Sequence, residues 1–527
     1  MHTKMIVLAT ILVAGLMLSA AAELQNVEVG GSVRLRGNFI GSTFNTFVGP
    51  APGPQVRWPA GVLGKRPIGG PFNPNVISLF DWDRAGSDVS FVEQRTRLNI
   101  KADFTDEVSA FIEVDSYDIW GEDFRSQNYV TGLDGRQNSV DDVEIFQAYI
   151  EADQMYGQPL RLRVGRQELA FGSQFLVGPR DFAFFYTGLS FDAVRLTYSQ
   201  DSYTIDAWAS KLAETMGDFG ENDIDFYGVY ASCTALESVV FDIYWMLLRD
   251  DRTIAEDVAG GALVEWFQDL WGVDDYDDTM LHTVGLRAAG KFGAFDFDAE
   301  AAYQFGQVDH LGQTFKPGLY GDDGAEAGNL ALKLDAGYAF DVAHHPHLFI
   351  GFRYFGGEDN RDITFWEWLN PFYKPEASVN FNRLFSNEIA SGFMDLNNDF
   401  SNAWLVRGGV EGAITEKLLA RFCVTYYQTL EEFDAPKTVN IFGNQVVIAP
   451  PFSWWTDANS KDLGIETYLF AEYKYSADLT FEVGWAHLFV GDGLKEGSFS
   501  RWNGYIFTGG TDDDGADYIY GGCKLFF

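Results

Sequence analysis

From residue 29 to the C-terminus, the chain repeats segments of about nine to thirteen residues in which apolar and polar positions alternate, as in a β-strand with two different faces. Most segments come in pairs joined by a short turn, and much longer polar connections separate successive pairs. The predicted pairs are 92–104 with 107–118, 143–153 with 159–170, 189–199 with 202–212, 222–233 with 237–248, 280–292 with 295–308, 328–341 with 347–357, 403–414 with 417–429 and 463–475 with 478–490. Single strands at 29–39 and 517–527 complete an even count of eighteen.

The alternation of short and long connections indicates the fold class. Outer-membrane barrels have short periplasmic turns and long outer loops, and each crossing strand needs about 10 residues. A soluble β-protein has no reason to place every long connection at one end. We therefore predict an all-β fold, an 18-stranded antiparallel transmembrane β-barrel with short periplasmic turns and long extracellular loops. A barrel of this size leaves an aqueous channel.

The first 22 residues have the pattern of a secretory signal peptide: a charge at Lys4, an apolar stretch, and the small residues Ala20, Ala21 and Ala22. The apolar stretch is shorter than the about 20 residues that a spanning helix needs. No linker or composition change divides residues 23–527, so we predict a single barrel domain in the bacterial outer membrane.

Composition narrows the partners. The chain is 46% hydrophobic and 16% aromatic, which suits a lipid-facing surface around a wet interior. A formal charge of −39 argues against nucleic acid as a partner. We find no motif for an enzyme, a cofactor or a metal site. His282 and His487 are the only histidines well within predicted strands. Lipid of the outer membrane is the expected surrounding.

Strand parity assigns arginines to the lumen. In the segment from residue 160, Leu160, Leu162 and Val164 share one face and Arg161 and Arg163 the other. An arginine facing lipid at mid-membrane would cost about 2–4 kcal/mol, so the charged face points inward. The same argument places the following arginines in the lumen: Arg34, Arg36, Arg95, Arg97, Arg161, Arg163, Arg195, Arg287, Arg353, Arg407 and Arg421.

Two interpretations of these arginines stay open. They could form an electropositive path for an anionic solute, because a guanidinium is permanently charged and matches carboxylates. Alternatively, they could pair with inward acids and hold the wall together, and a paired wall can still present a positive constriction. The predicted inward acids are Glu93, Asp103, Glu113, Asp115, Asp298, Glu300, Glu411 and Glu482.

Two stretches resemble a known family. One contains Val164-Gly-Arg-Gln-Glu-Leu169, and the other is Phe191-Asp-Ala-Val-Arg-Leu196. Together they resemble the GRQ-type and FDG-V-R-type strands of the alginate-export family of outer-membrane barrels, over roughly residues 90–200. The resemblance implies an eighteen-stranded channel for an anionic polysaccharide with arginines in its constriction, and adds Arg166 to the candidates. By parity Arg166 faces outward unless Gly165 marks a bulge or the lipid-exposed part of the strand has already ended.

We therefore expect an outer-membrane channel that passes an alginate-like anionic oligo- or polysaccharide, or a small acidic solute, through an Arg-lined lumen. The alternatives are a general uptake porin for small solutes, and a structural or adhesive barrel closed by the loops at 40–91 and 358–402. On the family resemblance we expect a monomer.

Overall fold

A computed structural model describes most of the barrel and part of its connections. The described residues are 24–41, 89–105, 107–120, 143–179, 188–214, 223–251, 270, 279–307, 325–357, 366, 377–378, 380–392, 401–431, 434–436, 438–441, 444–447, 456–458, 460–492, 506–507 and 515–527. The predicted signal peptide and most of the first long connection lie outside this set.

Eighteen long strands form the wall. They are β1 (Asn26–Gly41), β2 (Val89–Thr105), β3 (Val108–Ile119), β4 (Val143–Ala152), β5 (Leu160–Gln167), β6 (Phe191–Gln200), β7 (Tyr203–Ala213), β8 (Ile224–Leu236), β9 (Val239–Asp250), β10 (Thr279–Phe292), β11 (Phe295–Gln307), β13 (Leu330–Ala339), β14 (His347–Phe355), β16 (Ala403–Ala413), β17 (Leu418–Thr429), β22 (Asp462–Lys474), β23 (Leu479–Val490) and β25 (Ala516–Phe526).

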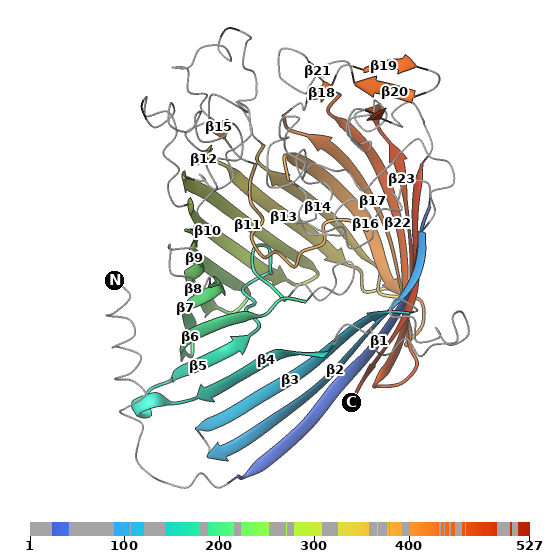
Figure 1. Cartoon of the computed structure of the whole chain (residues 1–527). Helices are drawn as coiled ribbons and strands as arrows, with labels where there is room; N and C mark the ends of the chain where they lie inside the picture. Colours follow the sequence, from blue (N-terminus) through green and yellow to red (C-terminus); the bar gives the residue numbers. More distant parts are fainter. Residues whose placement is uncertain are drawn as a thin grey trace, which may run out of the picture.

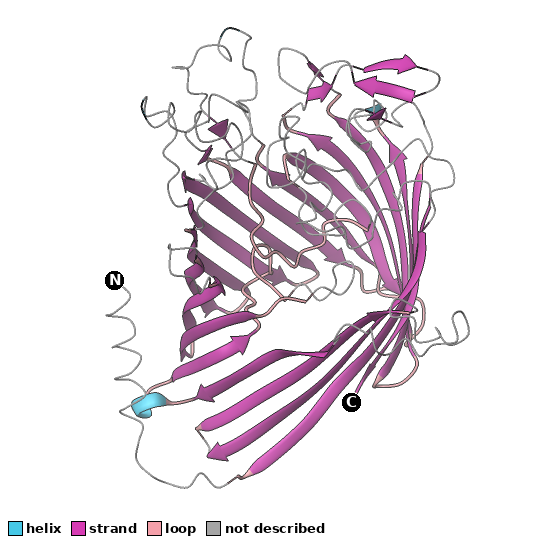
Figure 2. Cartoon of the chain, in the orientation of Figure 1, coloured by secondary structure: helices cyan, strands magenta, loops and turns pink. Residues whose placement is uncertain are grey.

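Short elements belong to the connections. The 3-10 turn η2 (Met155–Gly157) lies in the β4–β5 hairpin (Figure 2). The remaining strands are β12 (Ala325–Ala327), β15 (Ala377–Ser378), β18 (Asp434–Pro436), β19 (Thr438–Ile441), β20 (Asn444–Val447), β21 (Thr456–Ala458) and β24 (Ile506–Phe507).

The sheet is closed. Each long strand pairs antiparallel with its neighbours along the chain, and β1 pairs with both β2 and β25, where Val33 lies opposite Leu525 (Figure 1). The predicted number and order of strands are confirmed. The clearest difference concerns the strand predicted to run to residue 170. It ends at Gln167, after which the chain turns into the barrel interior (Figure 1).

The two faces of the wall differ as the parity predicts. On β2, Leu98 and Ile100 are 45% and 44% exposed on the outer side, whereas Arg95 and Arg97 are buried by inward neighbours. Apolar side chains on the outer face are expected where a strand contacts lipid. Within the described part of the chain, no helix has the length and apolar character needed to cross a bilayer.

Candidate functional site in the barrel lumen

Ion pairs between neighbouring strands cover the inner wall. Arg36 Nε lies 2.6 Å from Glu93 Oε1, and Arg95 binds Asp115 through two nitrogens. Other arginines that the sequence predicts to face inward repeat this arrangement with the following partners: Arg97 with Asp115, Glu113 and Glu168; Arg161 with Asp153 and Glu151; Arg163 with Glu151; Arg195 with Asp206; Arg287 with Asp242 and Asp298; Arg353 with Asp335 and Glu388; Arg407 with Asp335; and Arg421 with Glu411.

The guanidinium of Arg34 lies 5.5 Å from the centre of the Phe526 ring.

Most of the acids that the sequence places inward also belong to this network. Asp103 lies 3.2 Å from Lys101, Asp298 3.1 Å from Lys333, and Glu482 2.5 Å from Lys524. Because each of these cations has a carboxylate beside it, the wall carries both signs of charge at short intervals.

Arg166 does not face the lumen. It binds both carboxylate oxygens of Asp192 at 2.8 and 3.0 Å, and both residues share the outer face with Val164 and Val194. The strand pairing runs without a register shift through Gly165, so no bulge reverses the face. The prediction of Arg166 as a lumen residue is therefore wrong, and simple parity gives its position.

The motif that carries the resemblance has a structural role at the end of β5. Gly165 has a φ of 129°, and a Cβ at this position would lie 2.3 Å from the carbonyl oxygen of Ala148. Only glycine fits such a close approach at positive φ. Gln167 Nε2 then donates to the Ala193 carbonyl at 3.0 Å. The Gly165 approach brings β5 close to β4, and the Gln167 hydrogen bond and the Arg166–Asp192 pair fix β5 to β6 where the chain leaves the wall.

Two segments from distant connections meet inside the barrel. Residues 168–179 follow β5 and residues 380–392 follow β14, and we call them together the inner shelf (Figure 1). Val177 and Phe385 form a parallel bridge, in which Phe385 N donates to Leu176 O at 2.8 Å and Gly178 N to Phe385 O at 2.9 Å. Asn387 N donates to Gln174 O at 3.1 Å. These hydrogen bonds give partners to backbone N–H and C=O groups that no longer pair within the sheet.

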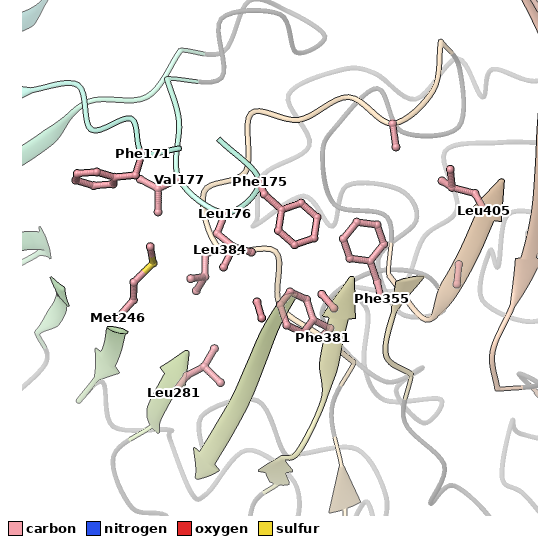
Figure 3. Packing of buried hydrophobic residues seen from close by; sticks show 14 of the residues in the cluster. Phe171, Phe175, Leu176, Val177, Met246, Leu281, Phe355, Phe381, Leu384 and Leu405 are labelled. Carbon is pink, nitrogen blue, oxygen red and sulfur yellow. The ribbon is translucent and has the colours of Figure 1, made fainter. Parts of the chain in front are cut away.

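Apolar side chains fix the shelf to the wall (Figure 3). Leu176, Val177 and Leu384 are at most 3% exposed. Phe175 stacks on Phe355 of β14 with ring centres 5.7 Å apart. Burying a large apolar side chain contributes about 1.5–3 kcal/mol, so this cluster gives the shelf a defined position.

Polar contacts attach the shelf at several strands. Ser173 Oγ donates to Glu300 of β11 at 2.7 Å, and Gln304 of β11 exchanges two hydrogen bonds with Asn382. At the far end, Gly392 N donates to Glu466 of β22 at 2.7 Å. The shelf is thus tied to the wall from β11 to β22.

Glu388 is the main charged anchor of the shelf. It pairs with Arg353, whose side chain is fully buried, and lies 3.7 Å from Lys333 Nζ. Burial alone would raise the pKa of Glu388, but the charges of Arg353, Lys333 and Arg407 outweigh it and lower the pKa to about 2. A lowered folded-state pKa stabilises the fold above the ordinary value of 4.5, and this contribution is lost as the pH falls toward 2. The anchor therefore stays ionised at neutral pH.

A cavity of about 640 Å³ lies between the shelf residues 387–392 and the wall. Its lining combines cations, carboxylates and aromatic rings. The cations are Arg34, Arg36, Arg407, Arg421 and Lys524; the carboxylates are Asp296, Asp335, Glu411, Glu466, Glu472 and Glu482; the aromatic residues are Phe349, Tyr468, Phe470, Tyr518 and Tyr520. The Arg421 side chain is 44% exposed and that of Arg407 is 23% exposed, so both keep solvent-accessible donors beside their acid partners.

The comparison with protein families decides the assignment, because the family model for alginate export matches residues 82–504. The chain belongs to the alginate export family. Together with the closed eighteen-stranded barrel, this makes it an outer-membrane channel of bacteria. None of the curated proteins compared with this family member matches it significantly.

Solved outer-membrane proteins give weaker likenesses to this alginate export family member. Pseudomonas aeruginosa OccK11 is 9% identical, with a TM-score of 0.47, and the match covers 97% of this chain and 100% of that one. Pseudomonas aeruginosa OccK5 is 10% identical at a TM-score of 0.44, covering 95% and 98%. An anion-selective porin from Comamonas acidovorans is 8% identical at a TM-score of 0.38, covering 95% and 99%.

The sequence interpretation missed the residues that anchor the shelf. Lys333 lies between Leu332 and Leu334 on a predicted strand, and the parity argument used for the arginines would have found it. Glu388 lies in a long connection with no periodic pattern, where parity assigns no direction, and so does Arg383, whose guanidinium lies 4.6 Å from the centre of the Phe355 ring of β14. Their roles depend on contacts between segments far apart in the chain.

Proposed function

We propose that this channel passes an acidic saccharide, or another small acidic solute, through the cavity beside the inner shelf. Arg421 carries the proposal, because it lies on a strand, is 44% exposed in the cavity and is oriented by Glu411. A guanidinium has five N–H donors, so an acid partner on one edge leaves others for a carboxylate of the solute. Arg407 offers a second cation on the neighbouring strand.

The rest of the lining suits a polyhydroxylated solute. Carboxylates of the cavity can accept hydrogen bonds from sugar hydroxyl groups, and tyrosine hydroxyl groups can donate or accept. The cations and carboxylates of the cavity lie close together, so single cations can bind an acidic group of the solute although the pore as a whole is not strongly positive. A general porin for small solutes is the alternative, and it requires no preference for acidic saccharides.

Changing both Arg407 and Arg421 to alanine tests whether these two charges give the channel a preference for anions. In planar bilayers under a KCl gradient, we expect the anion-over-cation permeability ratio to fall about threefold or more, because two fixed lumen charges have been removed. Arg166→Ala is the matched control. Arg166 has a 46% exposed side chain and a carboxylate partner, like Arg421, but it faces outward. An unchanged ratio in the double variant, or an equal change in the control, would contradict the proposed role.

A further inference from the structure

Aromatic residues follow Arg421 in a line across the inner wall of the cavity. Glu411 lies opposite Arg421, and Arg421 lies opposite Phe470. Phe470 in turn lies opposite Gly484, and Gly484 opposite Tyr520. The line runs from β16 through β17, β22 and β23 to β25, and its four residues with side chains line the cavity. Phe470 is thus one strand spacing, about 4.8 Å, from the cation that the proposed function uses.

Gly484 leaves room for the ring of Tyr520. A Cβ at position 484 would lie 2.1 Å from Cε1 and 2.4 Å from Cζ of Tyr520, so this ring occupies the place of a side chain on β23. The Tyr520 hydroxyl reaches β22, where it lies 2.7 Å from the hydroxyl of Tyr468. The rings of Tyr468 and Phe470 have centres 6.3 Å apart. Tyr520 therefore extends along the wall, and we call Tyr468, Phe470 and Tyr520 the aromatic patch.

The aromatic patch lies on a face where polar side chains are expected, because the inner face of an outer-membrane barrel contacts water. Phe470 and Tyr520 are half-buried and line the cavity. Phe355, by contrast, is fully buried where Phe175 of the inner shelf stacks on it. Covering an apolar ring that water still reaches is favourable. The patch therefore suits a ligand that has apolar as well as polar surface.

We propose that the aromatic patch binds the C–H face of a pyranose ring, so that Phe470 and Tyr520 select saccharides over acids without a sugar ring. This inference rests on the proposed function, in which Arg421 binds the acidic group. Aromatic rings are electron-rich and attract the slightly positive C–H groups of a sugar. Because Arg421 is one strand spacing from Phe470, the ring and the acidic group of one sugar unit have separate partners on neighbouring strands.

Current blockade in planar bilayers by three hexamers tests this site. Hexagalacturonate carries sugar rings and acids, maltohexaose carries sugar rings alone, and hexaglutamate carries acids alone. Phe470→Leu should raise the half-blocking concentrations of hexagalacturonate and maltohexaose about fivefold, because leucine is apolar but has no aromatic ring. Hexaglutamate should block this variant as it blocks the wild type. Arg421→Ala should weaken blockade by hexagalacturonate and hexaglutamate and leave that by maltohexaose unchanged.

Phe111→Leu is the matched control. Phe111 is a half-buried phenylalanine that shares the inner face of β3 with Glu113, and its ring centre lies 5.2 Å from that of Tyr149, but it lies outside the cavity. All three hexamers should block this variant as they block the wild type. Heat-modified migration on gels establishes that each variant is folded.

Two results would overturn the stacking site even if Arg421→Ala still weakens blockade by hexagalacturonate. One is unchanged blockade by maltohexaose in Phe470→Leu, and the other is a loss for hexaglutamate as large as that for maltohexaose. A selective loss of the two saccharides in Phe470→Leu, with no effect of Arg421→Ala, would instead contradict the proposed function and support the stacking site.

Discussion

Replacing residues 383–389 by a glycine-serine segment of equal length is expected to raise single-channel conductance roughly threefold or more. The change removes Phe385, which pairs with Leu176 and Val177, and Glu388, which pairs with Arg353. Without these contacts, the shelf loses both its apolar and its charged attachment, and the wide lumen of an eighteen-stranded barrel is no longer narrowed at this level. Single-channel recording in planar bilayers measures the change.

A glycine-serine replacement of residues 340–346 serves as the control. This segment has the same length and includes the short turn between β13 and β14, away from the inner shelf. Its conductance should equal that of the wild type. Unchanged conductance in the shelf variant, with an intact barrel by circular dichroism, would show that the inner shelf does not limit the pore. A silent wild type with a conducting shelf variant would favour the loop-closed structural barrel.

Arg353→Met is expected to destabilise the barrel by about 3 kcal/mol, because it leaves the buried partner Glu388 without its nearest cation. The Arg353 side chain is fully buried and also binds Asp335, with Nη2 2.6 Å from Oδ2. Guanidinium-induced unfolding in lipid vesicles measures the loss. Combining the change with Glu388→Gln should recover part of it, since the buried carboxylate is then neutral.

Arg163→Met provides the comparison at a less buried pair. Arg163 is 21% exposed and binds Glu151 with Nη2 2.6 Å from Oε2. This pair is partly buried and keeps more contact with solvent than the Arg353–Glu388 pair, so we expect a smaller loss of about 1 kcal/mol. Equal losses in the two variants would mean that burial of Arg353 does not determine the strength of the anchor.

The wall could be predicted from the sequence because two local rules define it. Alternation with a period of two assigns each strand residue to lipid or to lumen, and the lengths of connections give the order of hairpins. Leu98 and Arg97 lie on the faces that these rules predict. Arg166 also lies on the face that parity predicts. Its assignment to the lumen was wrong because it followed the family resemblance instead of parity.

The inner shelf could not be predicted, since its position depends on contacts with no local pattern. Residues 380–392 have no alternation, and Val177 meets Phe385 only because both segments turn inward. The sequence contained one sign of unusual local geometry, the glycine at position 165 of the motif. Its positive φ and its close approach to Ala148 explain why a glycine stands there. Nothing in the sequence of that strand indicates where the following turn packs.

Current blockade by an oligouronate, compared with a neutral oligosaccharide of equal length, tests the central claim most directly. Arg407 and Arg421 line the cavity, and the proposed function assigns them the binding of a solute carboxylate. We predict that the wild-type channel is blocked at an oligouronate concentration at least about tenfold lower than that of the neutral oligosaccharide, which corresponds to about 1.4 kcal/mol. Equal blockade by the two compounds, or stronger blockade by the neutral one, would contradict the account.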